Sequence, residues 1–242
     1  ACTGAVTVSI FGTDGVRGPA GEGVLEASSV RALAAAFAQS LGGGCGRVAL
    51  VRDTRESGTS LRDAVAEGLD AAGAQAVDLG VLPTPALSWW LERDGRASGG
   101  IAITASHNPW FDNGLKLFAG DGTKVPDALQ VACEEHYRSQ AKLPALRTSG
   151  ELLLDESEAA EQGYVQSLST GIEGALEDRT VVIDHAAGAA WRILPAALRA
   201  AGALPISIAP EPSGRNINEN VGAVHPERAA EAVLQHGAWQ AL

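Results

Sequence analysis

Apolar segments with the spacing of helices alternate with short apolar runs typical of strands, and this alternation limits the fold of the chain more than any other feature. The predicted helices cover residues 26–41, 60–72, 87–92 and 127–139. The predicted strands cover residues 47–52 (RVALVR), 75–79, 100–104 (GIAIT) and 114–118 (GLKLF). Alternating elements with connections this short predict an α/β fold of mixed α/β layers, in which helices pack on a largely parallel sheet.

The alternation fades once and then resumes, which predicts two domains. Pro, Ser and charged residues replace the periodic pattern over residues 143–156, as expected of a linker. We therefore predict a first domain over residues 1–142 that folds by itself, and a second over residues 157–242. The elements predicted in the second are a helix at 158–168, a strand at 180–184, a helix at 195–201, a strand at 204–209 and a helix at 226–236.

The second run stops just after its last helix, where the alternation next requires a strand. We therefore expect an incomplete second domain with an open sheet edge, at which two copies of the chain could pair as a homodimer.

The charge balance excludes several classes of partner. Eighteen Lys and Arg against 29 Asp and Glu give a net charge of -11, which repels nucleic acids and anionic membranes. No apolar run approaches the ~20 residues of a membrane-spanning helix. A small phosphorylated ligand is still compatible with this charge if a few cations converge in one cleft.

The cysteine pattern predicts neither a metal site nor a disulfide framework. Cys2, Cys45 and Cys133 are odd in number and widely separated. We expect them to be apolar thiols in a reducing compartment, and the protein to be cytoplasmic.

The segment TASHNP places Ser106 directly after a predicted strand. Ligand sites of α/β proteins lie at such strand ends, and a serine hydroxyl fixed there can accept a phosphoryl group. The alternative is an ordinary turn, because Ser and Asn commonly bond the local backbone in turns.

Two further segments carry cations that could face a phosphate. FGTDGVRG has glycines at positions 12, 15 and 18, whose flexible backbone can direct N–H groups at an anion, and it has Arg17, whose guanidinium matches phosphate oxygens. The alternative is a hairpin loop. Lys116 follows Ser106 by ten residues, and its alternative is plain exposure to solvent.

The remaining charged groups favour a structural interpretation. Arg52, Asp53 and Arg55 follow a predicted strand and could orient Arg17 or bind solvent, and we favour a structural role for all three. Four histidines have no partners at metal-ligand spacing and are also expected to be structural: His136, His185, His225 and His236.

Taken together, the segments resemble the α-D-phosphohexomutase superfamily. FGTDGVRG, RDTRESG, PTPA, TASHNP and NGLKLF occur in the order and at the spacings of that family, and the resemblance runs from about residue 10 to about residue 236. NGLKLFAGDGTKVPD and NINENVGAVHPE are most similar to bacterial phosphoglucosamine mutases.

The resemblance implies an intramolecular phosphotransferase of the isomerase class. Ser106 would be the phosphoserine and, through its phosphate, a ligand of Mg²⁺, while Lys116, Arg17 and His107 would assist proton transfer and hold the phosphate. The implied reaction interconverts glucosamine 6-phosphate and glucosamine 1-phosphate in amino-sugar metabolism. A sugar 1,6-bisphosphate would be the intermediate and the activating phosphoryl donor.

The chain also departs from the family pattern. It contains no Asp-Gly-Asp-x-Asp-Arg run, which in the family supplies the aspartate ligands of the metal. We therefore expect this polypeptide by itself to be catalytically incomplete. The alternatives are phosphomannomutase or phosphoglucomutase activity on another hexose phosphate, and a non-catalytic fragment that binds phosphate or a partner.

Overall fold

A six-stranded sheet forms the centre of the first part of the molecule in the computed structural model, which describes residues 9–12, 15–42, 46–139 and 152–242. The strand order is β1-β5-β4-β2-β3-β6. The strands are β1 (Val16–Pro19), β2 (Arg47–Arg52), β3 (Gln75–Val81), β4 (Ala97–Ile103), β5 (Asp112–Ala119) and β6 (Leu153–Asp155). β5 is antiparallel to both β1 and β4, and the other pairs are parallel.

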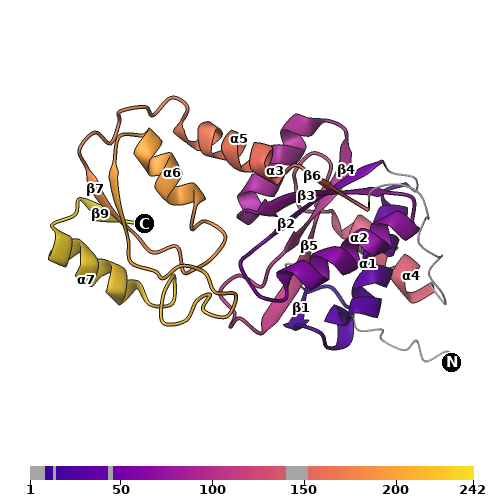
Figure 1. Cartoon of the computed structure of the whole chain (residues 1–242). Helices are drawn as coiled ribbons and strands as arrows, with labels where there is room; N and C mark the ends of the chain where they lie inside the picture. The colour runs from indigo at the N-terminus through magenta and orange to yellow at the C-terminus, as the bar shows by residue number, and fades with distance from the viewer. Residues whose placement is uncertain (1–8, 13–14, 43–45, 140–151) are drawn as a thin grey trace.

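Helices cover both faces of this sheet, which confirms the predicted mixed α/β layers (Figure 1). Val48 and Leu50 of β2 face one layer, whereas Ala49 and Val51 face the other, and all four side chains are buried. A strand buried on both faces reads as a continuous apolar run, which is why RVALVR predicts β2 well. The first layer contains α1 (Ala27–Ser40), α2 (Gly58–Ala71) and α4 (Asp127–Ser139), and the second contains α3 (Thr84–Asp94) and α5 (Ser157–Ser169). A short 3-10 helix (Gly23–Leu25) precedes α1.

Helices α1 and α2 approach each other closely at Gly68. A Cβ atom at this position would lie 2.2 Å from the carbonyl oxygen of Arg31 and 2.9 Å from Cβ of Ala34. Gly68 therefore sets the distance between the two helices. Cys133 of α4 is fully buried beneath the same layer, as expected of an apolar thiol, and its burial raises its pKa to about 12. Cys2 and Cys45 lie outside the described residues.

The second part is a smaller parallel sheet of order β8-β7-β9, flanked by α6 (Ile193–Ala200) and α7 (Pro226–His236). Its strands are β7 (Thr180–Ile183), β8 (Leu204–Ser207) and β9 (Gln240–Ala241). The sequence predicts no strand after the last helix, and this prediction is wrong, because β9 follows α7. Gly237 ends α7 at φ 58°, and the chain then pairs with β7 through bonds such as Trp239 N–H to the Thr180 carbonyl, 2.8 Å.

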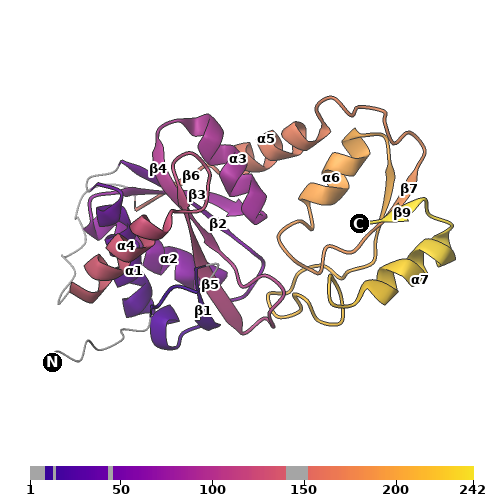
Figure 2. The ribbon, with the colours of Figure 1, turned by 180° about the vertical axis from the view of Figure 1, so that it is seen from behind.

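The linker predicted over residues 143–156 differs from the structure at its end. Residues 153–155 form β6, which pairs with β3 of the large sheet, while residues 140–151 lie outside the described part. α5 then runs from the large sheet toward α6, and both views show it bridging the two parts (Figures 1 and 2). Among the described residues, every helix is too short or too polar to cross a lipid bilayer.

Candidate functional site

The segment that carries Ser106 is a fixed loop at the end of β4, here called the serine loop (residues 104–112). The Thr104 N–H donates to the Gly114 carbonyl at 3.0 Å, and the Thr104 hydroxyl donates to Asp53 at 2.7 Å. The same hydroxyl oxygen accepts the N–H of Ser106 at 3.1 Å. Ser106 itself is exposed and has φ 56°, a left-handed conformation that costs a non-glycine residue of order 1 kcal/mol. Its side chain is therefore presented to solvent on a backbone that the surrounding contacts hold.

Arg55 fixes the backbone of this loop through hydrogen bonds. Its side chain is fully buried, pairs with Asp53 at 2.9 Å, and donates to backbone carbonyls of the loop. These carbonyls belong to Ser106 (2.9 Å), Asn108 (2.9 Å), Pro109 and Asp112 (2.9 Å). The structural role predicted for Asp53 and Arg55 is confirmed, and Arg55 acts on the serine loop instead of on Arg17. Arg52 is also structural, since it pairs with Asp78.

Arg17 and Lys116 lie on the same face of the large sheet. Arg17 is opposite Gly114 in the β1–β5 register, and Lys116 follows two residues further along β5. Side chains two residues apart on a strand share a face. Arg17 is exposed and reaches the serine loop, with its Nη1 at 3.4 Å from Oδ1 of Asn108.

The turn before β1 requires a glycine for this arrangement. Gly15 has φ 102°, and a Cβ atom there would lie 2.2 Å from the carbonyl oxygen of Leu115. Residues 13 and 14 of the FGTDGVRG segment lie outside the described part, so the predicted anion-binding backbone remains a prediction.

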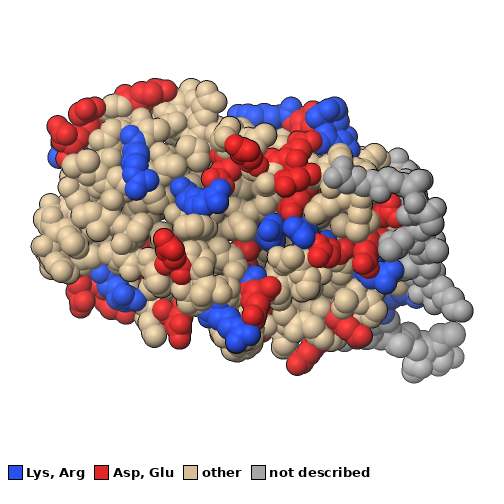
Figure 3. Space-filling view, in the orientation of Figure 1, with Lys and Arg blue, Asp and Glu red and all other residues tan. Residues whose placement is uncertain are grey.

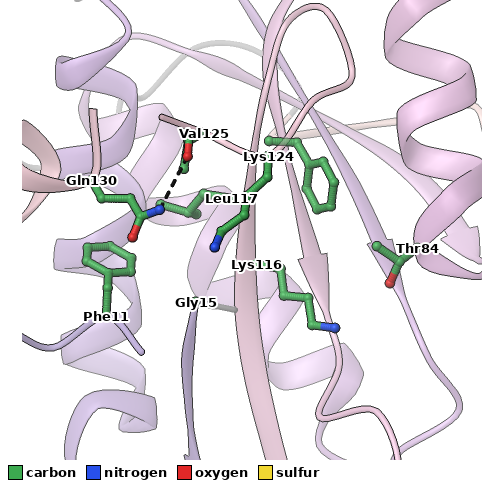
Figure 4. Close-up of a pocket in the computed structure, with 9 residues that line it drawn as sticks. Phe11, Gly15, Thr84, Lys116, Leu117, Lys124, Val125 and Gln130 are labelled. Carbon is green, nitrogen blue, oxygen red and sulfur yellow. Dashed lines mark hydrogen bonds between the residues drawn. The ribbon is translucent and has the colours of Figure 1, made fainter. Parts of the chain in front are cut away.

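Lys116 lines a pocket of about 230 Å³ between β5 and the start of α3. Figure 4 shows its ammonium group on the side of Thr84, while Lys124 enters the same pocket from the neighbouring turn. The rest of the lining includes the apolar side chains of Phe11 and Phe118. Cations against an apolar wall attract an anion more strongly than they would in open water.

Ser106 lines a second pocket of about 230 Å³, between the two parts of the molecule. Thr84 lines both pockets, so the Ser106 and Lys116 sites adjoin each other. His185 and Asn218 reach the second pocket from the second part. His185 is 8 % exposed, and its Nδ1 has no hydrogen-bond partner among the residues that the structure describes. Burial lowers the pKa of His185, against the opposing influence of Asp184.

Sequence analysis missed the link between the second part and Ser106. The sequence predicts a structural role for His185, and it assigns no role to Asn218, which lies in the segment NINENVGAVHPE. The rule that ligand sites lie at strand ends could have drawn attention to His185, which comes just after β7. Asn218 lies in the loop between β8 and α7, to which this rule does not apply. His107 is exposed at the tip of the serine loop, and its contact with a phosphate remains a prediction.

The described residues do not fit the magnesium site that the resemblance implies. No group of three or more His, Cys, Asp or Glu side chains lies close enough among them to hold a metal ion. Asp53, the carboxylate beside Ser106, is already bonded to Arg55 and Thr104. Across the face drawn in Figure 3, Lys and Arg are interspersed with Asp and Glu, as expected of a surface with no large field of one sign.

Comparison with known proteins gives concordant relatives. Residues 8–143 match the family described as phosphoglucomutase/phosphomannomutase, alpha/beta/alpha domain I. The chain is 42% identical over 232 residues to a phosphoglucosamine mutase of Rhodococcus opacus and 44% identical over 236 residues to one of Mycobacterium ulcerans. Both alignments cover 95% of this chain and 52% of the relative, so the chain spans about half the length of these curated relatives.

A solved structure agrees with this match. A phosphoglucomutase/phosphomannomutase family protein from Burkholderia thailandensis superposes with a TM-score of 0.76 at 26% identity, over 93% of this chain and 49% of that chain.

Proposed function

Because this chain belongs to the phosphoglucomutase/phosphomannomutase family, we propose that it supplies the phosphoserine of a phosphoglucosamine mutase, the activity named for its curated relatives. The observation that carries the proposal is the position of Ser106. This residue is exposed, its backbone is in the left-handed conformation, and Arg55 holds it at the end of a strand. A nucleophile fixed in this way converts one difficult transfer into two in-line steps.

In the first step, a hydroxyl of glucosamine phosphate attacks the phosphorus on Ser106. A bond forms between the sugar oxygen and phosphorus, the bond from phosphorus to Oγ of Ser106 breaks, and the sugar becomes a 1,6-bisphosphate. The sugar hydroxyl loses its proton to a base in the cleft, and Oγ takes one up. In the second step Oγ of Ser106 loses its proton and attacks the phosphorus of the other phosphate of the bisphosphate. A bond forms between Oγ and this phosphorus, the bond from phosphorus to the sugar oxygen breaks, and the sugar oxygen takes up a proton, which restores the phosphoserine and releases the isomeric monophosphate.

Arg17, Lys116 and His107 are the groups that we propose to serve this exchange. The fork of Arg17 suits two phosphate oxygens, and its contact with Asn108 supports a place beside the loop. Lys116 is proposed to donate the proton that Oγ takes up when the phosphoryl group leaves. His107 is proposed to contact the phosphate from the tip of the loop.

Magnesium would neutralise charge on the moving phosphoryl group, with the phosphate of Ser106 as one ligand. The described residues offer no further set of ligands for it. A phosphorylated hexosamine, or a hexose phosphate, is the proposed substrate.

The proposal is tested by treating the complete gene product with a sugar 1,6-bisphosphate and locating the phosphate by peptide mass spectrometry. We expect it on Ser106, and we expect Ser106→Ala to lower turnover by at least ~10³-fold, since loss of a nucleophile has costs of this order or larger. Ser60→Ala, at an exposed serine of α2, is the matched control and should keep full activity. Phosphate on Ser60 or Thr104, with Ser106 unmodified, would refute the proposal.

A further inference from the structure

We propose that Asn218 is a positioning residue for Ser106, which fixes the backbone of the serine loop from the second part of the molecule. This inference rests on the proposed function, because it concerns how Ser106 is held for phosphoryl transfer. It adds a residue 112 positions away from Ser106 in the chain.

The amide of Asn218 donates to two carbonyls of the serine loop. Its Nδ2 lies 2.9 Å from the carbonyl oxygen of Ser106 and 3.0 Å from that of Asn108. Nη2 of Arg55 donates to the same two oxygens, at 2.9 Å each. A carbonyl oxygen has two lone pairs, so the two donors together complete the bonding of both carbonyls. The loop is thus clamped between the two parts of the chain.

Asn218 is itself held in place. Its backbone has φ 60°, which asparagine tolerates better than most residues, and its N–H donates to the Ala186 carbonyl at 2.9 Å. The preceding segment is fastened to the first part by the pair between Arg215 and Glu56, at 2.8 and 2.9 Å. Because Asn218 is bonded to the second part and its segment is bonded to the first, its side-chain amide is held in one position relative to the serine loop.

The clamp sets the direction of the bond that carries the Ser106 hydroxyl. The direction of the Ser106 carbonyl fixes the backbone ψ angle of this residue, and with φ 56° it fixes the direction of the Cα–Cβ bond, from which Oγ extends. In-line transfer tolerates little error, because a displacement of about 1 Å can lower a rate by ~10²-fold. Without Asn218, the carbonyls of Ser106 and Asn108 would each keep the bond from Arg55 but lose their second donor.

The test compares Asn218→Gly with Asn220→Gly in the complete gene product. Glycine tolerates the left-handed backbone that Asn218 (φ 60°) and Asn220 (φ 54°) both adopt, so neither change adds backbone strain. Only the first removes the two bonds to the serine loop. Because Arg55 still bonds both carbonyls, no carbonyl is left unpaired, and the two variants should melt at similar temperatures.

We expect Asn218→Gly to lower kcat by roughly 10- to 100-fold with KM within about twofold, and amide exchange over residues 104–112 to become faster. Asn218→Asp, which keeps the size but replaces the donor by an acceptor, should lower kcat at least as much. A kcat equal to that of Asn220→Gly overturns the inference, even if exchange becomes faster. If the unaltered protein never phosphorylates Ser106, the proposed function fails, and unchanged exchange in Asn218→Gly would overturn the clamp separately.

Discussion

A single buried cation, Arg55, fixes the backbone of the serine loop. Its charge is balanced by Asp53 at 2.9 Å, and its other N–H groups point at backbone carbonyls of the serine loop. A lysine could balance the charge, but its compact ammonium lacks the planar fork that reaches several carbonyls at once. Because these donors are used within the protein, the charge of a phosphate on Ser106 has to be met by other cations, of which Arg17 and Lys116 are the candidates.

Lys116 gives the residue-scale prediction. Lys116→Ala in the complete gene product should lower kcat more than it raises KM, because its proton and charge matter most when Oγ of Ser106 gains negative charge in the transition state. Steady-state kinetics measure this split, and Lys124→Ala, in the same pocket, is the matched control with the smaller expected effect on kcat. An unchanged kcat with a raised KM would mean that Lys116 binds the substrate and takes no part in the chemical step.

At the scale of elements, the close contact of α1 and α2 depends on Gly68. We predict that Gly68→Ala lowers the free energy of unfolding by about 1–3 kcal/mol, because overpacking at a backbone contact exceeds the ~1 kcal/mol that alanine gains in helix propensity. The added Cβ would lie 2.2 Å from a backbone oxygen of α1.

Gly58→Ala, in the same helix, is the control. Its Cβ would meet a flexible Arg52 side-chain atom at 3.3 Å, so this variant should lose little stability. Denaturant unfolding compares the two. Equal stability of Gly68→Ala and the unaltered protein would contradict the packing argument.

The elements that the sequence predicts well are those with a clear apolar pattern, a continuous run in β2 and a helical period in α2. β2 and α2 lie within two residues of their predicted bounds, and the predicted resemblance to the phosphohexomutases is confirmed by the family match. β6 and β9, three and two residues long, are too short to show a period. β1 reads VRGP, a poor strand sequence, and it exists because β5 offers it hydrogen bonds.

Prolines caused one boundary error. α3 was predicted to begin at residue 87, after Pro83 and Pro85, but it begins at Thr84 with Pro85 in its first turn. Proline is tolerated there because the N–H groups of the first turn have no partner within the helix. The motifs also placed Ser106 and Arg17 near each other, whereas the contact of Asn218 with the serine loop has no local signature, since it spans 112 residues.

At the scale of the whole molecule, the two parts pack against each other through one shared apolar cluster. Ile193 of α6 belongs to the same apolar cluster as Trp90 of α3 and Tyr164 of α5. Polar contacts join the loops at the other side, among them the Thr54 hydroxyl to the Ala187 carbonyl at 2.6 Å. Unfolding of one part therefore exposes surface on the other.

His185 lies between the parts and gives the pH prediction. Its folded-state pKa is lowered by burial from 6.5, so at mildly acidic pH the unfolded chain binds a proton that the folded chain resists. Stability should therefore fall as pH drops below about 6.5, by up to ~1.4 kcal/mol per pH unit from this group.

We expect His185→Gln to flatten the dependence of the unfolding free energy on pH between 7 and 5. His236→Gln, at an exposed position in the last turn of α7, is the control for replacing a histidine that does not lie between the two parts. Parallel slopes for His185→Gln and the unaltered protein would show that His185 takes up its proton equally in both states.

The distance along the chain between Asn218 and Ser106 has a consequence for how the protein is made. A ribosome adds about 5–20 residues per second, so the 112 additions from Ser106 to Asn218 take roughly 6–22 s. During that interval the large sheet can form, while the serine loop has only the donors of Arg55. The nascent chain therefore completes the surroundings of Ser106 only after the sheet that carries it.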